Sequence, residues 1–147
     1  MMFEPGNLLF FDPFIFPDGG QPKAKYFLVL ADMDKGILLA SLPTSKDHVP
    51  ADVALKQGCL EMPERMVNVF VILAGQTVTD NGFSFKVNTF IYGANIRSYD
   101  TEVFLDQQAE EEVRISIVGK LEKSLFNTIK DCLRKSDAVR KNYKRYL

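Results

Sequence analysis

The pattern of apolar and polar positions divides the chain into a strand-rich first part and a helical end. Six stretches in the first part have the length and the aromatic or β-branched content of strands, and turn-forming residues bound most of them. These stretches cover residues 7–11, 26–31, 37–42, 59–62, 67–73 and 83–92. Many short strands with turns between them predict a small barrel and not a layered α/β sheet.

The last third of the chain mixes one further strand with helices. Apolar residues alternate over 113–117, which indicates a strand, and residues 100–108 suit a short helix or a turn. Leu121, Leu125, Ile129 and Leu133 recur at helical spacing, so we expect an amphipathic helix over 121–135. Ser136 is a plausible N-cap for a final helix over 137–146.

Together these elements predict a mainly β, α+β fold. We expect a single domain over 1–147, with a small barrel of about five to seven strands over about 6–118. A helical segment over about 120–147 would pack its apolar stripe on that barrel. A chain of 147 residues with 46% apolar and 25% charged residues has the composition of one globular unit.

The stretches at 26–31 and 37–42 flank the turn sequence DMDKG and read as an antiparallel hairpin. A hairpin brings the start of its first strand beside the end of its second. Lys25 should therefore lie near Thr44 and Ser45. A lysine beside two hydroxyl groups can bind phosphate, since the ammonium supplies charge and the hydroxyls supply hydrogen bonds.

Sites for single-stranded RNA place aromatic faces beside positive charge. Lys23, Lys25 and Lys46 supply the charge in this stretch, and Tyr26 supplies a ring next to it. The alternative interpretation is that the ring belongs to the core and that Lys23 and Lys46 are solvated surface residues.

Composition and missing motifs exclude several function classes. The longest apolar runs are far shorter than a membrane span, and the first residues lack the basic start of a signal peptide, so we expect a cytoplasmic protein. There is no phosphate-binding glycine loop, no G-x-S-x-G and no H-E-x-x-H. Because the three glutamates at 110–112 are contiguous, their side chains diverge, and we expect neither a metal nor another cofactor.

Cys59 and Cys132 lie 73 positions apart, with no further cysteine nearby. This spacing excludes a C-x-x-C redox or zinc motif. Two free thiols are the favoured interpretation in a cytosolic domain, and a disulfide is the alternative. His48 is the only histidine and stands in a proline-containing loop, where a solvated residue is expected.

Charge is distributed unevenly along the chain. Residues 120–147 contain nine basic and three acidic residues, a net charge of +6, whereas the whole chain carries −1. Such a separation can mark a basic face for a polyanion, or it can be the solvated surface of a helix. Both interpretations stay open.

Five segments in a fixed order resemble the PemK/MazF family of toxin–antitoxin toxins. They are GNLLFFDPF, GGQPKAKYFLVLAD, ILLASLPTSK, TFIYGANIRSYD and IVGKLEKSLFNTIKDCL. The resemblance spans about residues 6–135, and it depends on the order and spacing of motifs that are individually short. It sets Lys25 on the family's catalytic arginine, Tyr26 on the proline that follows it, and Thr44 with Ser45 on the catalytic threonine and its neighbour.

The resemblance implies an SH3-like barrel, a homodimer and cleavage of single-stranded RNA without a metal. It also implies inhibition by a small antitoxin protein with an acidic tail. The implied catalytic residues are Lys25, Thr44 and Ser45, and the expected substrate-binding residues are Lys23, Tyr26, Lys46 and Arg97.

A second hypothesis is a non-catalytic barrel of the same kind that acts as a protein- or nucleic-acid-binding module. It is favoured by Lys25 and Tyr26, which stand where the family has Arg-Pro. A lysine does not make the two-point phosphate contact of an arginine.

Overall fold

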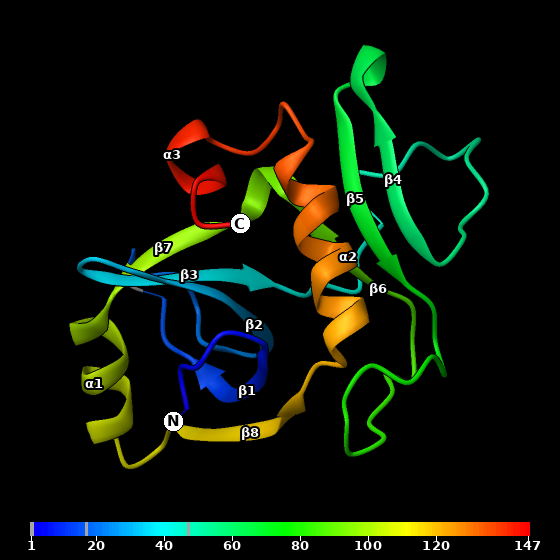
Figure 1. The fold of residues 1–147 in the computed structure, drawn as a ribbon. Helices are drawn as coiled ribbons and strands as arrows, with labels where there is room; N and C mark the ends of the chain where they lie inside the picture. Colours follow the sequence, from blue (N-terminus) through cyan, green and yellow to red (C-terminus); the bar gives the residue numbers. More distant parts are fainter. Residues whose placement is uncertain (1, 17, 47) are drawn as a thin grey trace.

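The computed structural model describes residues 2–16, 18–46 and 48–147, and within these the chain forms two antiparallel sheets with helices beside them (Figure 1). The first sheet has the strand order β7-β3-β2-β1-β8 and the second has the order β4-β5-β6. The first contains β1 (Asn7–Phe14), β2 (Lys23–Met33), β3 (Gly36–Ser41), β7 (Arg97–Asp100) and β8 (Arg114–Lys120). The second contains β4 (Gly58–Met62), β5 (Val67–Ile72) and β6 (Thr89–Tyr92).

The prediction of a mainly β, α+β fold is confirmed. The described strands do not close into one barrel, because the chain leaves β3 through a long connection and starts a separate sheet with β4. A backbone hydrogen bond of 2.9 Å from Phe90 to the carbonyl of Pro43 joins this connection to β6. Side-chain packing also holds the two sheets together, since Leu28 of β2 and Ile91 of β6 belong to one buried cluster.

Strand β2 is central in the first sheet and is apolar on both faces. Residues 27–31 are all buried, which is typical of a strand covered on two sides. Since successive side chains point to opposite faces, Leu28 and Leu30 join the core between the sheets, whereas Phe27 and Val29 join a second cluster on the other face.

Helix α2 (Lys123–Arg134) fills the space between the two sheets (Figure 1). Its buried residues Ile129, Cys132 and Leu133 belong to the same cluster as Leu8 and Leu28 of the first sheet. The amphipathic helix predicted from the apolar spacing is thus confirmed. Its start is two residues later than predicted, because Leu121 pairs with Thr79 in an isolated bridge.

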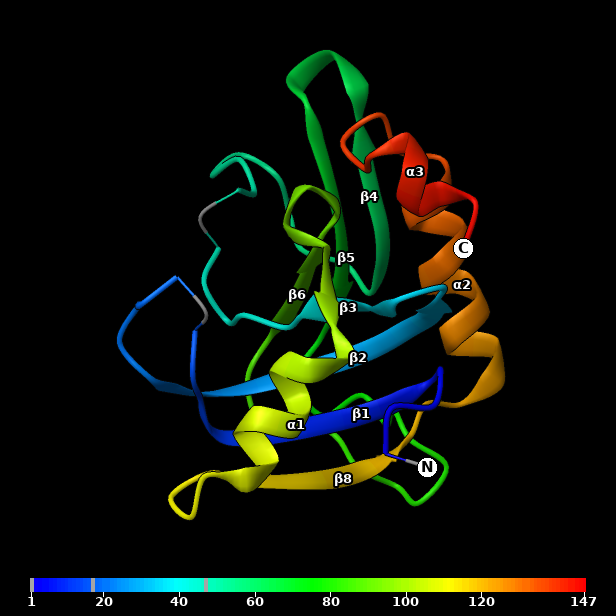
Figure 2. The ribbon, with the colours of Figure 1, turned by 90° about the vertical axis from the view of Figure 1, so that its left-hand side faces the viewer.

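Helix α1 (Thr101–Ala109) covers the opposite face of the first sheet (Figure 2). Phe104 is fully buried there among Leu9, Phe11 and Phe27. Gln107 donates to the carbonyl of Ile15 at 3.1 Å and accepts from its amide at 3.0 Å. These contacts fasten the helix to the chain that follows β1.

Two predicted elements are shorter in the structure. The final helix α3 covers only Lys141–Lys144, and Ser136 does not cap it. The buried Ser136 hydroxyl instead accepts a 3.0 Å hydrogen bond from the amide of Ala138, which makes a turn. Of the strand predicted over 83–92, only β6 forms, because Phe83 and Phe85 turn away to pack on the ring of Tyr26.

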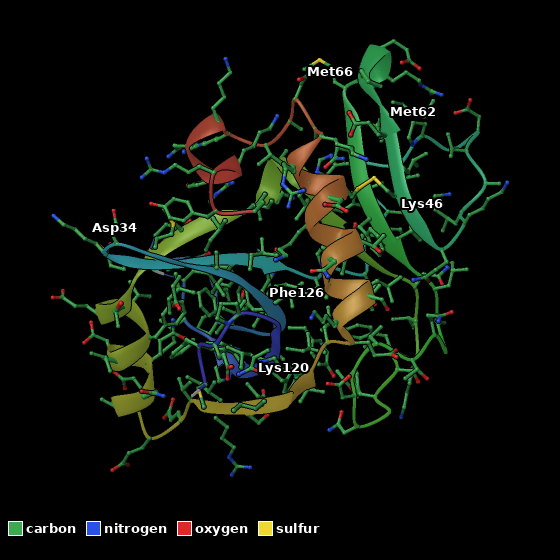
Figure 3. All side chains as sticks on the ribbon, in the orientation of Figure 1. Asp34, Lys46, Met62, Met66, Lys120 and Phe126 are labelled. Atoms are coloured by element: carbon green, nitrogen blue, oxygen red, sulfur yellow. A yellow bond between two sulfur atoms is a disulfide. The ribbon has the colours of Figure 1, made fainter. Side chains whose placement is uncertain are left out.

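The prediction of two free thiols is wrong: Cys59 and Cys132 form a disulfide that joins β4 to α2 (Figure 3). Packing of α2 beside β4 brings the two Cα atoms to 5.6 Å, within the range that a disulfide needs. The two cysteines are 73 residues apart in the sequence, so the sequence alone does not predict that they lie close together. In the described part of the chain no helix has the length and apolar character to cross a membrane.

Candidate functional site

The β2–β3 hairpin brings together most of the residues that the sequence singles out. Phe27 pairs with Ser41, and the amide of Leu42 donates to the carbonyl of Tyr26 at 3.1 Å. The chain beyond Leu42 then continues beside the first residues of β2. The result is a cavity of about 400 Å³, called here the hairpin cavity, whose lining includes Lys23, Lys25, Tyr26, Thr44 and Ser45.

Lys25 also lines a second cavity, on the other face of the sheet. Strand alternation puts its side chain on the side of Phe27 and opposite Tyr26. Its Nζ atom lies 5.1 Å from the ring centroid of Phe16, a cation–π distance. This second cavity, of about 270 Å³, is called here the Arg97 cavity, and its polar lining consists of Asp18, Lys25, Ser41, Asn95, Arg97 and Tyr99.

The predicted constellation is therefore brought together in part. Thr44 and Ser45 share the hairpin cavity with Lys25, but the Lys25 ammonium lies on the opposite face, beside Arg97. Lys46 is exposed and belongs to neither lining. Arg97 is predicted as a binding residue through the resemblance alone. Asn95 and Tyr99 stood in the same quoted segment, yet nothing in their spacing distinguished them.

Different hydrogen bonds fix the residues that line the two cavities. The Arg97 guanidinium donates to the carbonyls of Ala94 and Ile96 at 3.0 and 2.9 Å, which fixes it at the start of β7. The carbonyl of Ser45 accepts a 2.6 Å hydrogen bond from the hydroxyl of Tyr92. This bond anchors the backbone of Ser45, while the side chains of Thr44 and Ser45 are exposed.

Tyr26 combines the two roles considered for it. Its ring packs against Phe10, Phe83 and Phe85, with centroid distances of 4.6, 6.0 and 5.1 Å. The residue is nevertheless only half-buried, and it lines the hairpin cavity. A ring held by core contacts at the edge of a cavity is a rigid surface on which a flat group can stack.

Burial lowers the pKa of Lys25 from its ordinary value, and the neighbouring charge of Lys23 lowers it further. Burial also raises the pKa of Tyr99, so that its phenol stays protonated. A lysine with a lowered pKa exchanges its proton more readily near neutral pH than a solvated lysine does. Lys25 can therefore supply positive charge and also take part in proton transfer.

The lowered pKa of Lys25 leads to a stability prediction for Lys25→Met. Burial disfavours the ammonium, which methionine lacks, so at pH 7 the variant should be more stable by up to about 0.5 kcal/mol. As the pH rises through the lowered pKa, the folded wild type loses its proton before the unfolded chain does. Wild-type stability then rises, and the difference should shrink.

Urea unfolding of both proteins at pH 7 and towards pH 10 measures this effect. A difference in the free energy of unfolding that widens with pH would contradict the prediction. Lys35→Met is a matched control, because Lys35 is exposed in the turn at the opposite end of the same hairpin. It should show no such pH dependence.

Comparisons of the chain with protein-family models, curated proteins and solved structures find no match. The resemblance to the PemK/MazF family therefore stays a prediction from the residues. The described residues also contain no group of three or more histidine, cysteine or acidic side chains that could hold a metal ion. The two cavities instead contain lysine, arginine and hydroxyl side chains.

Proposed function

We propose that the chain is a toxin-like endoribonuclease that cleaves single-stranded RNA without a metal and belongs to a toxin–antitoxin pair. The observation that carries the proposal is the hairpin cavity, where a lysine pair, a half-buried tyrosine and two exposed hydroxyl residues line one space. The two-sheet fold would then be a divergent form of the SH3-like barrel of PemK/MazF toxins.

The cavity offers the groups that an RNA strand needs. Lys23 supplies positive charge for the phosphate backbone in the hairpin cavity, whereas the ammonium of Lys25 and the guanidinium of Arg97 supply it on the far side of β2. The ring of Tyr26 can stack on a base, since base stacking on an aromatic face tolerates any sequence. Lys46, outside the lining, is close in sequence to Ser45 and would contact an adjoining phosphate.

In the proposed reaction the RNA 2'-hydroxyl attacks the adjacent phosphorus. The O2'–P bond forms and the P–O5' bond breaks, which leaves a 2',3'-cyclic phosphate and a free 5'-hydroxyl. Lys25 neutralises the phosphate oxygens and takes part in moving a proton from the 2'-oxygen to the leaving 5'-oxygen. Thr44 and Ser45 orient the phosphate by hydrogen bonds. To act in this way, the Lys25 side chain has to turn from Phe16 towards the hairpin cavity.

The same proposal includes the partners of a toxin. A small antitoxin with an acidic tail would compete with RNA for Lys23, Lys25 and Arg97, and the chain would act as a homodimer in the cytoplasm. The cytoplasm contains thiol reductants that keep cysteines reduced, so Cys59 and Cys132 would exist there as two thiols whenever the reductants reach the disulfide.

Incubation of the purified chain with a mixed-sequence RNA in EDTA tests the proposal. We expect cleavage, with a rate that falls at least about 100-fold in Lys25→Ala and in Thr44→Ala, the usual effect of removing one transition-state contact. Lys35→Ala, at the other end of the hairpin, should cleave at the wild-type rate. Intact RNA at high protein concentration would contradict the proposal.

A non-catalytic binding module is the second candidate function. It is favoured by the position of the Lys25 ammonium, which lies with Arg97 and apart from the hydroxyls of Thr44 and Ser45. In the same RNA experiment such a module would bind without cleavage, and its affinity would fall steeply with salt. Binding that survives Lys25→Ala but not charge reversal at Arg140 and Lys144 would assign the contact to the basic C-terminal segment.

A further inference from the structure

The Arg97 cavity collects polar side chains from three adjacent strands of the first sheet. Ser41 of β3 lies opposite Phe27 of β2, and Lys25 comes two residues before Phe27. Leu39, two residues before Ser41, lies opposite Arg97 of β7. Paired residues and residues two apart share a face of the sheet, so Lys25, Ser41 and Arg97 project from the same side. Helix α1 covers another part of that side (Figure 2).

The Arg97 guanidinium is oriented by the backbone and keeps most of its donors. Its Nη1 atom donates to the carbonyls of Ala94 and Ile96 at 3.0 and 2.9 Å. Among the described residues, its Nε and Nη2 atoms have no hydrogen-bond partner. These two atoms form the fork with which arginine binds two oxygens of one phosphate. The backbone contacts therefore hold the side chain in place and leave the fork unoccupied.

The Lys25 ammonium reaches the same cavity without an acidic partner. It lies 5.1 Å from the ring centroid of Phe16, and no ion pair within the described ranges involves Lys25 or Arg97. Burial and the charge of Lys23 lower the pKa of Lys25, and no carboxylate counters this effect. Two cations in one small cavity repel each other, and an anion between them would remove that repulsion.

Neutral hydrogen-bond donors complete the lining. Ser41, Asn95 and Tyr99 all line the cavity, and in the part of the chain that the structure describes their side chains have no hydrogen-bond partner. Burial raises the pKa of Tyr99, so its phenol stays protonated and can donate. Hydroxyl and amide groups can reach oxygens that the two cations do not contact. Donors from three strands match a tetrahedral anion with several free oxygens.

Asp18 is the acidic residue of the lining and leaves the cavity with a net charge of +1. It is exposed, and its Oδ1 atom accepts a 3.0 Å hydrogen bond from the amide of Gly20. It pairs with neither cation. Because its carboxylate repels an anion, removing its charge should strengthen anion binding. A purely structural role of Asp18 would not have this effect.

We propose that the Arg97 cavity binds a phosphomonoester group as a dianion. The Arg97 fork would hold two of its oxygens, the Lys25 ammonium would contact the third, and Ser41 would donate a further hydrogen bond. A phosphodiester of an RNA backbone has one charge and two free oxygens, whereas a phosphomonoester has up to two charges and three free oxygens. The second set matches two cations on separate strands. The inference goes beyond RNA cleavage, because it uses Lys25 where the structure places it.

Titration of the full chain with methyl phosphate at pH 8 tests the proposal, and dimethyl phosphate is the matched ligand control. Methyl phosphate is a dianion above its second pKa of about 6, whereas dimethyl phosphate is a monoanion. Amide chemical shifts should change at Ser41, Asn95 and Arg97, and dimethyl phosphate should bind at least about 10-fold more weakly. Equal affinity for the two esters would overturn the proposal.

Three variants test the charges. Arg97→Met should weaken the binding of methyl phosphate at least about 10-fold. Arg114→Met makes the same change in charge at the opposite edge of the sheet, where Arg114 is exposed on β8, and should bind like the wild type. Asp18→Asn keeps an acceptor for the amide of Gly20 and should tighten binding about two- to fivefold. Full affinity in a folded Arg97→Met variant would overturn the proposal, and so would binding that Asp18→Asn does not strengthen.

The phosphomonoester can belong to a small molecule or to the end of a nucleic acid strand. A hexamer of 2'-O-methyl uridine with a 5'-phosphate, compared with the same hexamer with a 5'-hydroxyl, distinguishes these sources. Tighter binding of the phosphorylated hexamer than of both the hydroxyl hexamer and methyl phosphate would assign the group to a strand end. Binding no tighter than that of methyl phosphate would assign it to a small molecule. These probes lack the 2'-hydroxyl that the proposed cleavage needs, so failure of cleavage and failure of this proposal give different results.

Discussion

Replacing Cys59 with serine is expected to lower the free energy of unfolding of the oxidised protein by about 4 kcal/mol. The disulfide closes a long loop, with a sequence separation of 73 between its cysteines. In the chain-entropy description, a loop of this length restricts the unfolded state strongly, and the loss on removing the link is about 4 kcal/mol. Cys59 is the better of the two positions to replace, because it is exposed, whereas Cys132 is 3% exposed within the main core.

Urea or thermal unfolding with and without a thiol reductant measures this effect. The reductant should destabilise the wild type about as much as Cys59→Ser does, and it should have no further effect on the variant. A wild type whose unfolding midpoint ignores the reductant would contradict the prediction. Detection of two free thiols in the denatured, unreduced chain would also contradict the prediction.

Truncation of Phe104 to alanine should cost about 3–5 kcal/mol, the usual range for a buried phenylalanine. The ring is fully buried and contacts Phe3, Phe11 and Tyr99, with centroid distances of 4.6, 6.1 and 5.7 Å. It is the only large apolar residue of α1 that is fully buried. Its loss leaves a cavity and removes the main apolar contact of the helix with the first sheet.

The neighbouring residue provides a control for Phe104→Ala. Leu105 lies on the same helix and is 57% exposed, so Leu105→Ala should change stability by no more than about 0.5 kcal/mol. If equilibrium unfolding gave the same loss of unfolding free energy for Phe104→Ala and Leu105→Ala, the ring of Phe104 would not be the contact that anchors α1. Phe104→Leu should fall between wild type and Phe104→Ala, because it refills part of the cavity.

The Phe104 contacts and the disulfide also hold residues in the walls of cavities. Phe104 packs on Tyr99, whose ring lines the Arg97 cavity. The disulfide joins β4, which carries Glu61, to α2, whose Cys132 carbonyl accepts from Asn68. Phe104→Ala should therefore also loosen the ring of Tyr99 in the wall of the Arg97 cavity.

Local information in the sequence was sufficient to predict which residues meet at the hairpin cavity. The turn sequence DMDKG and its flanking apolar runs predicted the pairing of β2 with β3, and pairing brings Lys25 and Thr44 to one place. The side on which the Lys25 ammonium lies was not predicted. It depends on the strand face that Lys25 shares with Phe27, and thus on which residues of β2 pack against α1 and which against α2.

The groove between the β4–β5 hairpin and the loop that follows α2, in contrast, could not be predicted from any single stretch. Its lining combines the β4–β5 hairpin, the turn at Ala94 and the loop around Asp137, which are far apart in the sequence. No periodicity in the sequence relates them.

The sequence by itself determined the strand-rich character, the central hairpin, the amphipathic helix α2 and the basic end of the chain. These features follow from local periodicity, turn residues and charge, which act between neighbours in the sequence. Only the tertiary structure decided that the strands form two sheets, that Cys59 meets Cys132, and that Lys25 lies beside Arg97. The physical reason is that each of these depends on how α1 and α2 pack against the sheets, and burial of apolar surface between distant segments sets that packing.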